Sequence, residues 1–267
     1  RVPFGNIGER MLGQVHLRGI GFVGSLPRHI PILWQLSYDN TCDVLAFSLQ
    51  GYCLGTSGRY RNKYFGGAVM DIRTLFLDVG GVILEPDPRF WERLRIEFGA
   101  PDNAEQMFYG EGGPWGACKT GLITYQDYVS HMADQLGIER AVLASLRTEL
   151  EWLIIQPMVD WVRQMRAQRS IEVIAVSNAD TTLEERLTQF QLMDLFDRVI
   201  NSARVGVAKP DPAIYQLALS YTSSVPESCL FIDDRERNMA AAQSLGIQTL
   251  VFRGFPEFSE DVGKLLC

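Results

Sequence analysis

The sequence predicts an α/β protein in which a doubly wound, Rossmann-like parallel sheet carries an inserted helical cap. Three observations lead to this fold class. Apolar runs at 74–77, 171–176 and 229–232 are continuous rather than alternating, as in strands buried on both faces of a parallel sheet. Amphipathic helical patterns separate these runs. The longest helical stretch lies between the first two runs, so we interpret it as an insertion into the sheet.

The first apolar run leads directly into Asp78, Val79 and the pair Gly80-Gly81. Asp78 therefore stands at the carboxyl end of a strand, where open α/β sheets bind their ligands. The two glycines let the backbone turn sharply and bring amide N–H groups toward a bound group. We hypothesise that Asp78 is a nucleophile that attacks phosphorus. The alternative is an aspartate that caps a turn after the strand.

Apolar residues recur at helical spacing from Phe90 to Leu153. An acidic, proline-containing turn at 85–88 precedes this stretch and is not expected to continue a strand. A glycine-rich break at 110–116 divides the helices. Trp115 and Lys119, in and just after this break, are candidate substrate-facing residues of the cap, and the alternative is that they are ordinary loop residues.

The rest of the chain alternates between helix and strand, as a doubly wound sheet requires. We expect helices at 157–169, 183–190, 213–220 and 237–245 and strands at 171–176, 197–201, 229–232 and 248–252. Residues 70–87 and 156–267 would then form the core domain, and residues 88–155 the helical cap.

Polar residues follow two of these elements at positions suited to an anion. Ser177 and Asn178 come directly after a strand and before a helix, where a hydroxyl and an amide can hold phosphate oxygens. Such a pair is also a common helix start. Lys209 precedes the helix capped by Asp211, and its ammonium would neutralise charge on a phosphate. A solvated surface lysine is the alternative.

Asp233 and Asp234 end the apolar strand at 229–232. Two adjacent carboxylates repel each other and lose stability unless a cation or a donor compensates them. Mg²⁺, held by one or two carboxylates together with substrate phosphate and water, is the natural compensation.

Residues 1–69 differ from the rest of the chain in composition. They contain 7 Lys and Arg against 3 Asp and Glu, whereas the remaining residues contain 18 against 29. No helical or strand period is sustained there, and prolines interrupt the most apolar part. We therefore expect the working domain to begin at Met70 and this leader to be weakly ordered or not part of the native protein.

The overall composition excludes several classes of function. The formal charge of −7 argues against a nucleic-acid surface, and no apolar run is long enough to span a membrane. Five scattered cysteines without a C-x-x-C pair fit a reducing cytoplasm better than a disulfide framework. We expect a cytoplasmic protein whose partner is a small molecule, and the sequence leaves its oligomeric state open.

The motifs D-V-G-G-V at 78–82, V-S-N at 176–178, A-K-P-D-P at 208–212 and F-I-D-D-R-x-x-N at 231–238 together resemble the haloacid dehalogenase (HAD) superfamily. The resemblance covers residues 72–252, and the helical insertion is similar to the first cap class. The D-x-G-G-V and D-D-R features look most like the branch that contains sugar-phosphate phosphatases and the N-terminal phosphatase domain of epoxide hydrolases.

The resemblance implies a Mg²⁺-dependent phosphomonoester hydrolase that acts on a small phosphorylated metabolite. Asp78 would form an aspartyl-phosphate that water then hydrolyses. Ser177 and Lys209 would assist catalysis, while Val79, Gly80, Asn178, Trp115 and Lys119 would contact substrate. Asp78, Asp234, the supporting Asp233 and the carbonyl of Gly80 would form the metal site.

One position departs from the family's pattern. Most phosphatases of this superfamily carry a second aspartate two residues after the nucleophile, and Gly80 stands there in this chain. General acid–base catalysis contributes about 10²–10⁴-fold, so we expect a preference for good leaving groups such as anomeric, acyl or aryl phosphates. Glu85, Asp87 or Asp233 are alternative acids.

Two other functions stay open at this point. The first is a phosphate-ligand-binding or regulatory protein that has lost turnover, for which Gly80 is the sign. The second is a 2-haloacid dehalogenase, a class that needs no metal, although the Asp233-Asp234 pair argues for one.

Overall fold

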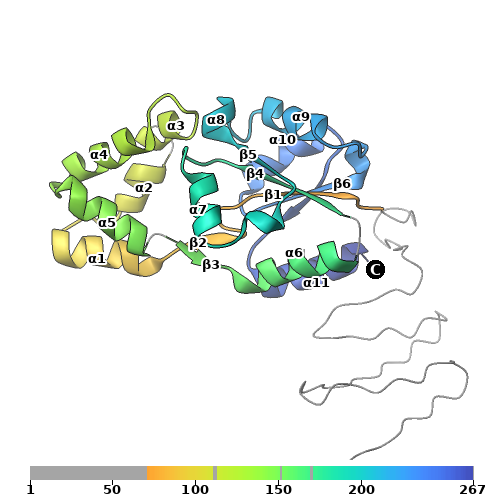
Figure 1. The fold of residues 1–267 in the computed structure, drawn as a ribbon, viewed down its shortest axis with the longest axis horizontal. Helices are drawn as coiled ribbons and strands as arrows, with labels where there is room; N and C mark the ends of the chain where they lie inside the picture. Colours follow the sequence, from red (N-terminus) through yellow and green to blue (C-terminus); the bar gives the residue numbers. More distant parts are fainter. Residues whose placement is uncertain (1–70, 111–112, 151, 169–170, 267) are drawn as a thin grey trace, which may run out of the picture. The chain divides into compact units, whose positions relative to one another are not determined.

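A computed structural model describes residues 71–110, 113–150, 152–168 and 171–266 (Figure 1). The expectations about residues 1–69 and about the start at Met70 fall outside these ranges. Within them, every helix is too short or too polar to cross a lipid bilayer.

The predicted parallel sheet is confirmed, and within the described residues it has five strands in the order β5-β4-β1-β6-β7. The strands are β1 (Thr74–Leu77), β4 (Glu172–Ser177), β5 (Arg198–Asn201), β6 (Cys229–Asp233) and β7 (Gln248–Val251), and all neighbours pair in parallel. β1 lies in the middle, between β4 and β6 (Figure 1). Its four residues are all buried, as the continuous apolar pattern predicts.

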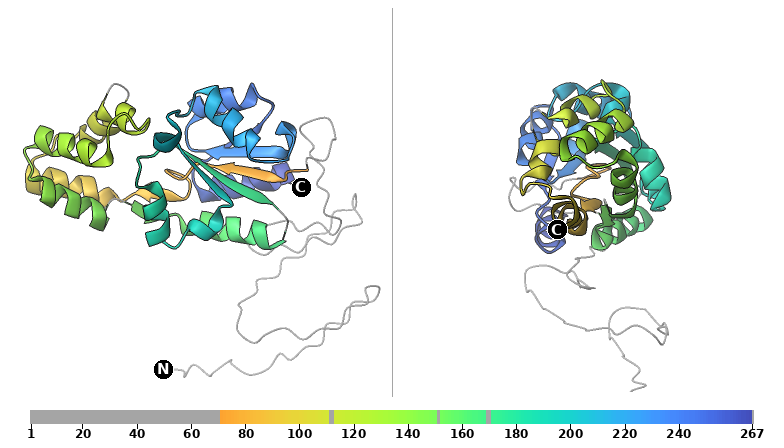
Figure 2. Two further views of the ribbon diagram at one scale, coloured as in Figure 1. Left: turned by 45° about the horizontal axis from the view of Figure 1, so that its top comes forward. Right: turned by 90° about the vertical axis from the view of Figure 1, so that its left-hand side faces the viewer.

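Helices cover both faces of the sheet, which makes the fold doubly wound. Alternate strand residues point to opposite faces, so Leu75 and Leu77 pack on one side and Phe76 on the other. The first side is covered by α6 (Gln156–Gln168), α7 (Leu183–Gln189) and α11 (Phe255–Leu266), and the second by α9 (Pro212–Ser220) and α10 (Met239–Gln243). Figure 2 shows α6 in green and α9 and α10 in blue on opposite sides of the strands.

Short helices complete the connections between these elements. They are α8 (Ser202–Val205) and the 3₁₀ turns η1 (Met193–Leu195), η2 (Pro226–Ser228) and η3 (Glu236–Asn238). The predicted helix at 237–245 is therefore a 3₁₀ turn followed by the short α10.

Five helices between β1 and α6 form what we call the helical insertion. They are α1 (Pro88–Phe98), α2 (Ala104–Tyr109), α3 (Pro114–Cys118), α4 (Tyr125–Leu136) and α5 (Arg140–Leu150), and they share a separate hydrophobic cluster. Asp87 caps α1 ahead of Pro88, and a capping box between Thr124 and Asp127 begins α4. The boundaries of core domain and cap stay a prediction.

A second, antiparallel sheet connects the insertion to the core, and the sequence analysis missed it. β2 (Leu84–Pro86) pairs with β3 (Trp152–Ile154). The expectations that residues 85–88 form only a turn and that the helical stretch continues to Leu153 are both wrong. Pro86 is tolerated because this strand pairs with only one neighbour in the described structure.

Candidate active site

The ends of three neighbouring strands and one loop place the predicted catalytic residues together. Asp78 directly follows β1, Ser177 ends β4, and Asp233 ends β6. Because β1 pairs with both β4 and β6 in parallel, these three ends meet at one edge of the sheet. Lys209 reaches the same place from the loop between α8 and α9.

The Asp78 carboxylate is held by three donors. Ser177 Oγ donates to Oδ1 at 3.1 Å, and the backbone N–H of Val79 donates to the same oxygen at 2.7 Å. Lys209 Nζ lies 2.9 Å from Oδ2. The side chain is thus fixed at the strand end rather than free to rotate. Val79 contributes its backbone, not its side chain, to this arrangement.

Lys209 is shared between two buried carboxylates. Its Nζ lies 2.6 Å from Oδ2 of Asp233 as well as close to Asp78, and the Lys209 side chain is fully buried. Burial by itself would lower the pKa of Lys209, but the two carboxylates outweigh that effect and raise the pKa. The amine therefore remains an ammonium. The alternative of a solvated surface lysine is wrong.

The three acidic groups of the site differ in their protonation equilibria. Burial raises the pKa of Asp78 to about 7, and the ammonium of Lys209 acts against that rise. Burial would also raise the pKa of Asp233, but Lys209 and the hydrogen bonds that Asp233 accepts bring it below its ordinary value. The pKa of Asp234 is raised by burial and by the neighbouring Asp233. Of the three carboxyl groups, Asp233 is the one whose pKa is lowered, and it pairs with Lys209.

Both carboxylate oxygens of Asp233 accept hydrogen bonds. Besides Lys209, it accepts from Asn238 Nδ2 at 2.8 and 2.9 Å and from the backbone N–H of Arg235 at 2.8 Å. The hydroxyl of Tyr215 in turn donates to the carbonyl of Asn238 at 2.8 Å. Asn238 ends the F-I-D-D-R-x-x-N motif but was missed as a site residue. We infer that Asp233 supports Lys209 more than it offers a ligand.

The donor set at this edge fits a hard divalent cation. Carboxylate oxygens of Asp78, Asp233 and Asp234 all lie within 4.8 Å of one another. Oδ1 of Asp234 is buried and accepts no hydrogen bond from any described residue. A buried acceptor without a donor is costly, and a cation bound to oxygen would satisfy it. The Gly80 carbonyl as a further ligand stays a prediction.

The side chain of Asn178 does not point to the position expected from the sequence. Its Nδ2 donates to the carbonyl of Lys209 at 2.9 Å, and its Oδ1 accepts from the Lys209 backbone N–H at 2.8 Å. Both polar atoms therefore clamp the loop that carries the ammonium. These two hydrogen bonds give Asn178 a positioning role, and its predicted contact with a phosphate stays a prediction.

A pocket opens beside Asp78 and is mostly apolar. Its lining comprises Val79, Gly80, Leu84, Trp115, Trp152, Ser177, Asn178, Ala179, Leu183 and Arg186. Trp115 is there as predicted, whereas Lys119 is not among the lining residues. Trp152 and Arg186 were missed because the first was assigned to a helix and the second had no motif around it.

Of the three alternative acids, Glu85 and Asp87 lie outside the cluster around Asp78, and Asp233 lies within it but is already paired. Asp87 caps α1 and pairs with Arg89, and these hydrogen bonds lower its pKa. Glu85 is an exposed residue of β2. Asp233 is committed to Lys209. None of the three is among the described residues that line the pocket.

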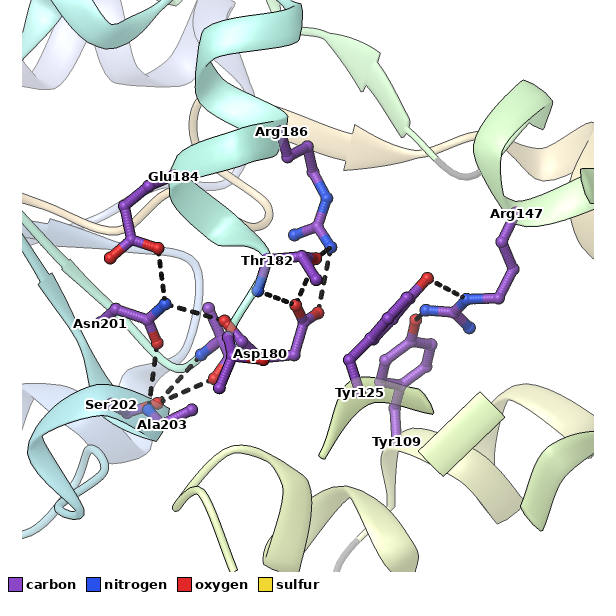
Figure 3. A network of polar contacts seen from close by, with 12 residues as sticks. Tyr109, Tyr125, Arg147, Asp180, Thr182, Glu184, Arg186, Asn201, Ser202 and Ala203 are labelled. Carbon is purple, nitrogen blue, oxygen red and sulfur yellow. Dashed lines mark hydrogen bonds and ion pairs between the residues drawn. The ribbon is translucent and has the colours of Figure 1, made fainter. Parts of the chain in front are cut away.

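Two polar networks flank the pocket (Figure 3). On the core side, Asp180 accepts from the backbone N–H of Thr182 at 2.7 Å and from Arg186 Nη2 at 3.0 Å. In the helical insertion, the buried Arg147 donates to the hydroxyls of Tyr125 and Tyr109 at 2.9 and 3.2 Å. The burial of Arg147 could not be predicted from the helical pattern, since arginines on amphipathic helices are usually solvated.

Comparison with known proteins matches this chain to one family and to several phosphatases. A family model of haloacid dehalogenase-like hydrolases matches residues 72–246. Bifunctional epoxide hydrolase 2 of Sus scrofa is 26% identical over 204 residues, which span 69% of this chain and 37% of that protein. D-ribitol-5-phosphate phosphatase of Bacteroides thetaiotaomicron is 22% identical over 189 residues, which span 67% of this chain and 90% of that protein.

A solved structure shares the fold. The crystal structure of a HAD family enzyme from Bacteroides thetaiotaomicron, in complex with magnesium and inorganic phosphate, has a TM-score of 0.58 at 22% identity. The match covers 70% of this chain and 98% of that one. By contrast, the chain spans only 19–37% of the length of three of the curated relatives it matches.

Proposed function

The chain belongs to the haloacid dehalogenase-like hydrolase family, and from this premise we propose that it is a Mg²⁺-dependent phosphomonoester hydrolase acting on a small phosphorylated metabolite. One observation carries the proposal. A fixed carboxylate, Asp78, lies 2.9 Å from a buried ammonium and within 4.8 Å of a carboxylate oxygen of Asp234. The phosphatase relative and the magnesium and phosphate of the solved HAD structure support it.

Asp78 and Asp234 would hold Mg²⁺, and a bound Mg²⁺ would offset the negative charge of the carboxylates and of the substrate phosphate. A carboxylate oxygen of Asp78 then forms a bond to phosphorus while the ester P–O bond breaks. The leaving group departs with that electron pair. Water next attacks phosphorus, which releases inorganic phosphate and returns Asp78 to its carboxylate form.

The neighbouring residues position the groups and balance their charge. Ser177 and the Val79 N–H hold the carboxylate in place. Lys209 places its ammonium where charge spreads over the transferring phosphoryl group, and Asp233 and Asn178 fix the side chain and the backbone of that lysine. Such positioning and electrostatic stabilisation suit the loose transition state of phosphoryl transfer.

A second candidate function rests on Gly80. Because this residue supplies no general acid, a protein that binds phosphate ligands without turnover is the alternative. A 2-haloacid dehalogenase is a further alternative, and the orphaned oxygen of Asp234 disfavours it.

Phosphate release from p-nitrophenyl phosphate tests the proposal. We expect release with Mg²⁺, loss of release with EDTA and recovery when Mg²⁺ is added back. Asp78→Asn should lower kcat by at least about 10³-fold, whereas Asp102→Asn, whose side chain is 93% exposed, serves as the matched control and should have no effect. Acid quenching with labelled substrate should trap a base-labile phosphoprotein in the wild type.

Other outcomes would point to the alternatives. Release that survives Asp78→Asn would exclude Asp78 as the nucleophile. Tight phosphate binding without turnover would favour the regulatory protein. Halide release from a 2-haloacid in EDTA would favour the dehalogenase.

A further inference from the structure

The pocket beside Asp78 joins two chemically different halves. Val79, Gly80, Ser177 and Asn178 form the half next to the nucleophile. The other half is apolar and consists of Leu84, Trp115, Trp152, Ala179 and Leu183, with Arg186 as the charged residue among the lining residues. A phosphate ester with its phosphorus at Asp78 and its leaving group in this pocket would place that group against these apolar side chains.

Trp152 is the residue of this apolar half whose side chain comes closest to the Cβ position of residue 80. An ideal Cβ at residue 80 would lie 4.0 Å from Cη2 of Trp152, and no other described side chain or backbone atom beyond its chain neighbours would come as close. The indole edge therefore faces the position from which a longer side chain at residue 80 would extend. The leaving group meets an aromatic ring there, not an acid.

The indole of Trp152 is held in place by Arg186, and its N–H group has no hydrogen-bond acceptor among the described residues. The Arg186 guanidinium lies 5.3 Å from the centre of the Trp152 ring. Arg186 itself is fixed by Asp180 and Thr182 (Figure 3). Nε1 of Trp152 is buried and donates to no described residue. A ligand oxygen would satisfy this donor.

Trp115 adds a second indole from a different element. Its ring lies 5.2 Å from that of Tyr109 and 5.5 Å from that of Tyr128. Tyr109 is in turn held by Arg147. The second indole is thus supported from within the helical insertion and presents a rigid aromatic surface to the pocket.

We propose that this pocket selects phosphate esters with an aromatic leaving group, with Trp152 as the specificity-determining residue. The inference rests on the proposed function and narrows it. Two independent observations lead to the same class of leaving group. Two indoles, those of Trp115 and Trp152, line the pocket, and residue 80 supplies no acid. As the ester P–O bond breaks, an aryl oxygen departs as a stable aryloxide, which then takes its proton from water. An alkoxide would need an acid at that moment.

The test compares naphthyl phosphate, which has a ring, with acetyl phosphate, which has a good leaving group without a ring. The measured quantity is the ratio of kcat/KM for naphthyl phosphate to that for acetyl phosphate. Trp152→Ala should lower this ratio by at least about ten-fold, and Trp152→Phe should restore most of it. Tyr221→Ala is the control, because Tyr221 follows α9, lies outside the lining residues and contacts Arg198, and it should leave the ratio unchanged.

Circular dichroism establishes whether each variant folds. If Trp152→Ala does not fold, Trp115→Ala provides the same test of the rate ratio. A ratio unchanged in both alanine variants would overturn the inference, as would faster wild-type hydrolysis of a polyol phosphate than of naphthyl phosphate. In either case, Asp78-dependent release from acetyl phosphate would leave the proposed function intact. No release from any phosphate would remove both.

Discussion

Nζ of Lys209 lies 2.9 Å from Oδ2 of Asp78, and both residues are buried, with 1% and 7% of their surface exposed. Asp233 is fully buried on the other side of the same ammonium. A single cation therefore serves two carboxylates away from solvent. The stability of this region and the proposed chemistry would therefore depend on the same three side chains.

Replacing Lys209 by methionine should affect both properties. Breaking a buried ion pair from one side costs about 3–5 kcal/mol, because the remaining charges lose their partner. We expect a loss of that size in urea unfolding, together with a kcat at least about 10²-fold lower. The double variant Lys209→Met/Asp233→Asn should recover part of the stability and none of the activity. Wild-type stability in the single variant would contradict the shared-cation arrangement.

Gly81→Ala should damage the proposed metal site. Gly81 has φ +81°, and an added Cβ would lie 2.7 Å from Cγ of Asp234. The carboxylate must shift, so we expect the Mg²⁺ concentration for half-maximal activity to rise at least about ten-fold. Gly99→Ala is the matched control, since Gly99 has φ +67° and open space around its Cβ position. A similar Mg²⁺ requirement in both variants would show that backbone strain alone is responsible.

Gly121→Ala should disturb the contact between the helical insertion and α8. Gly121 has φ +73°, and a Cβ there would collide with the carbonyl oxygen of Ala203. We expect kcat/KM to fall by about ten-fold or more, because the insertion carries Trp115 to the pocket. Gly137→Ala is the control, because Gly137 has φ +64° and no atom within 4 Å of its Cβ position. This variant should have the same backbone strain but should keep its kcat/KM. Steady-state kinetics of the two variants at saturating Mg²⁺ separates the effects.

The Asp180–Arg186 ion pair should make stability depend on pH. Burial would raise the pKa of Asp180, but Arg186 and Thr182 lower it below its ordinary value. A carboxylate with a lowered folded-state pKa stabilises the protein above its unfolded-state pKa of about 3.9 and loses that effect as pH falls through the folded-state value. Asp180→Asn should therefore lower Tm at pH 7. The difference in Tm between this variant and the wild type should become smaller toward pH 3.

The exposed pair of Asp134 and Arg140 offers the comparison for this experiment. Asp134→Asn should change Tm little at either pH, because exposed ion pairs contribute little. Equal changes in Tm for Asp180→Asn and Asp134→Asn at pH 7 would show that the buried ion pair stabilises the protein no more than the exposed pair does.

Asp78, Ser177 and Asp233 could be located from the sequence because continuous apolar runs mark buried parallel strands, and their polar ends share one edge. Trp152 could not be located in the same way. Its three-residue strand exists only because Leu84–Pro86 pairs with it, and that partner is distant in sequence. A local helical pattern extending to Leu153 therefore gave the wrong element.

The roles of Asn178 and Arg147 were hidden for related reasons. Asn178 binds a loop that the chain reaches only later, so its neighbours reveal nothing about its partner. Arg147 is buried because tyrosine hydroxyls from α2 and α4 meet its guanidinium. Periodicity reports which face of a helix is apolar, and it does not report which polar groups converge from other helices.

The strand order β5-β4-β1-β6-β7 also has a consequence for biosynthesis. Among the strands of this sheet, β1 is translated before both of its neighbours, β4 and β6. A nascent or prematurely terminated polypeptide that stops before Cys229 carries Asp78 without Asp233, Asp234 or the strand that supports them. Such a polypeptide therefore lacks the second carboxylate that pairs with Lys209, so truncation before Cys229 should abolish the proposed activity.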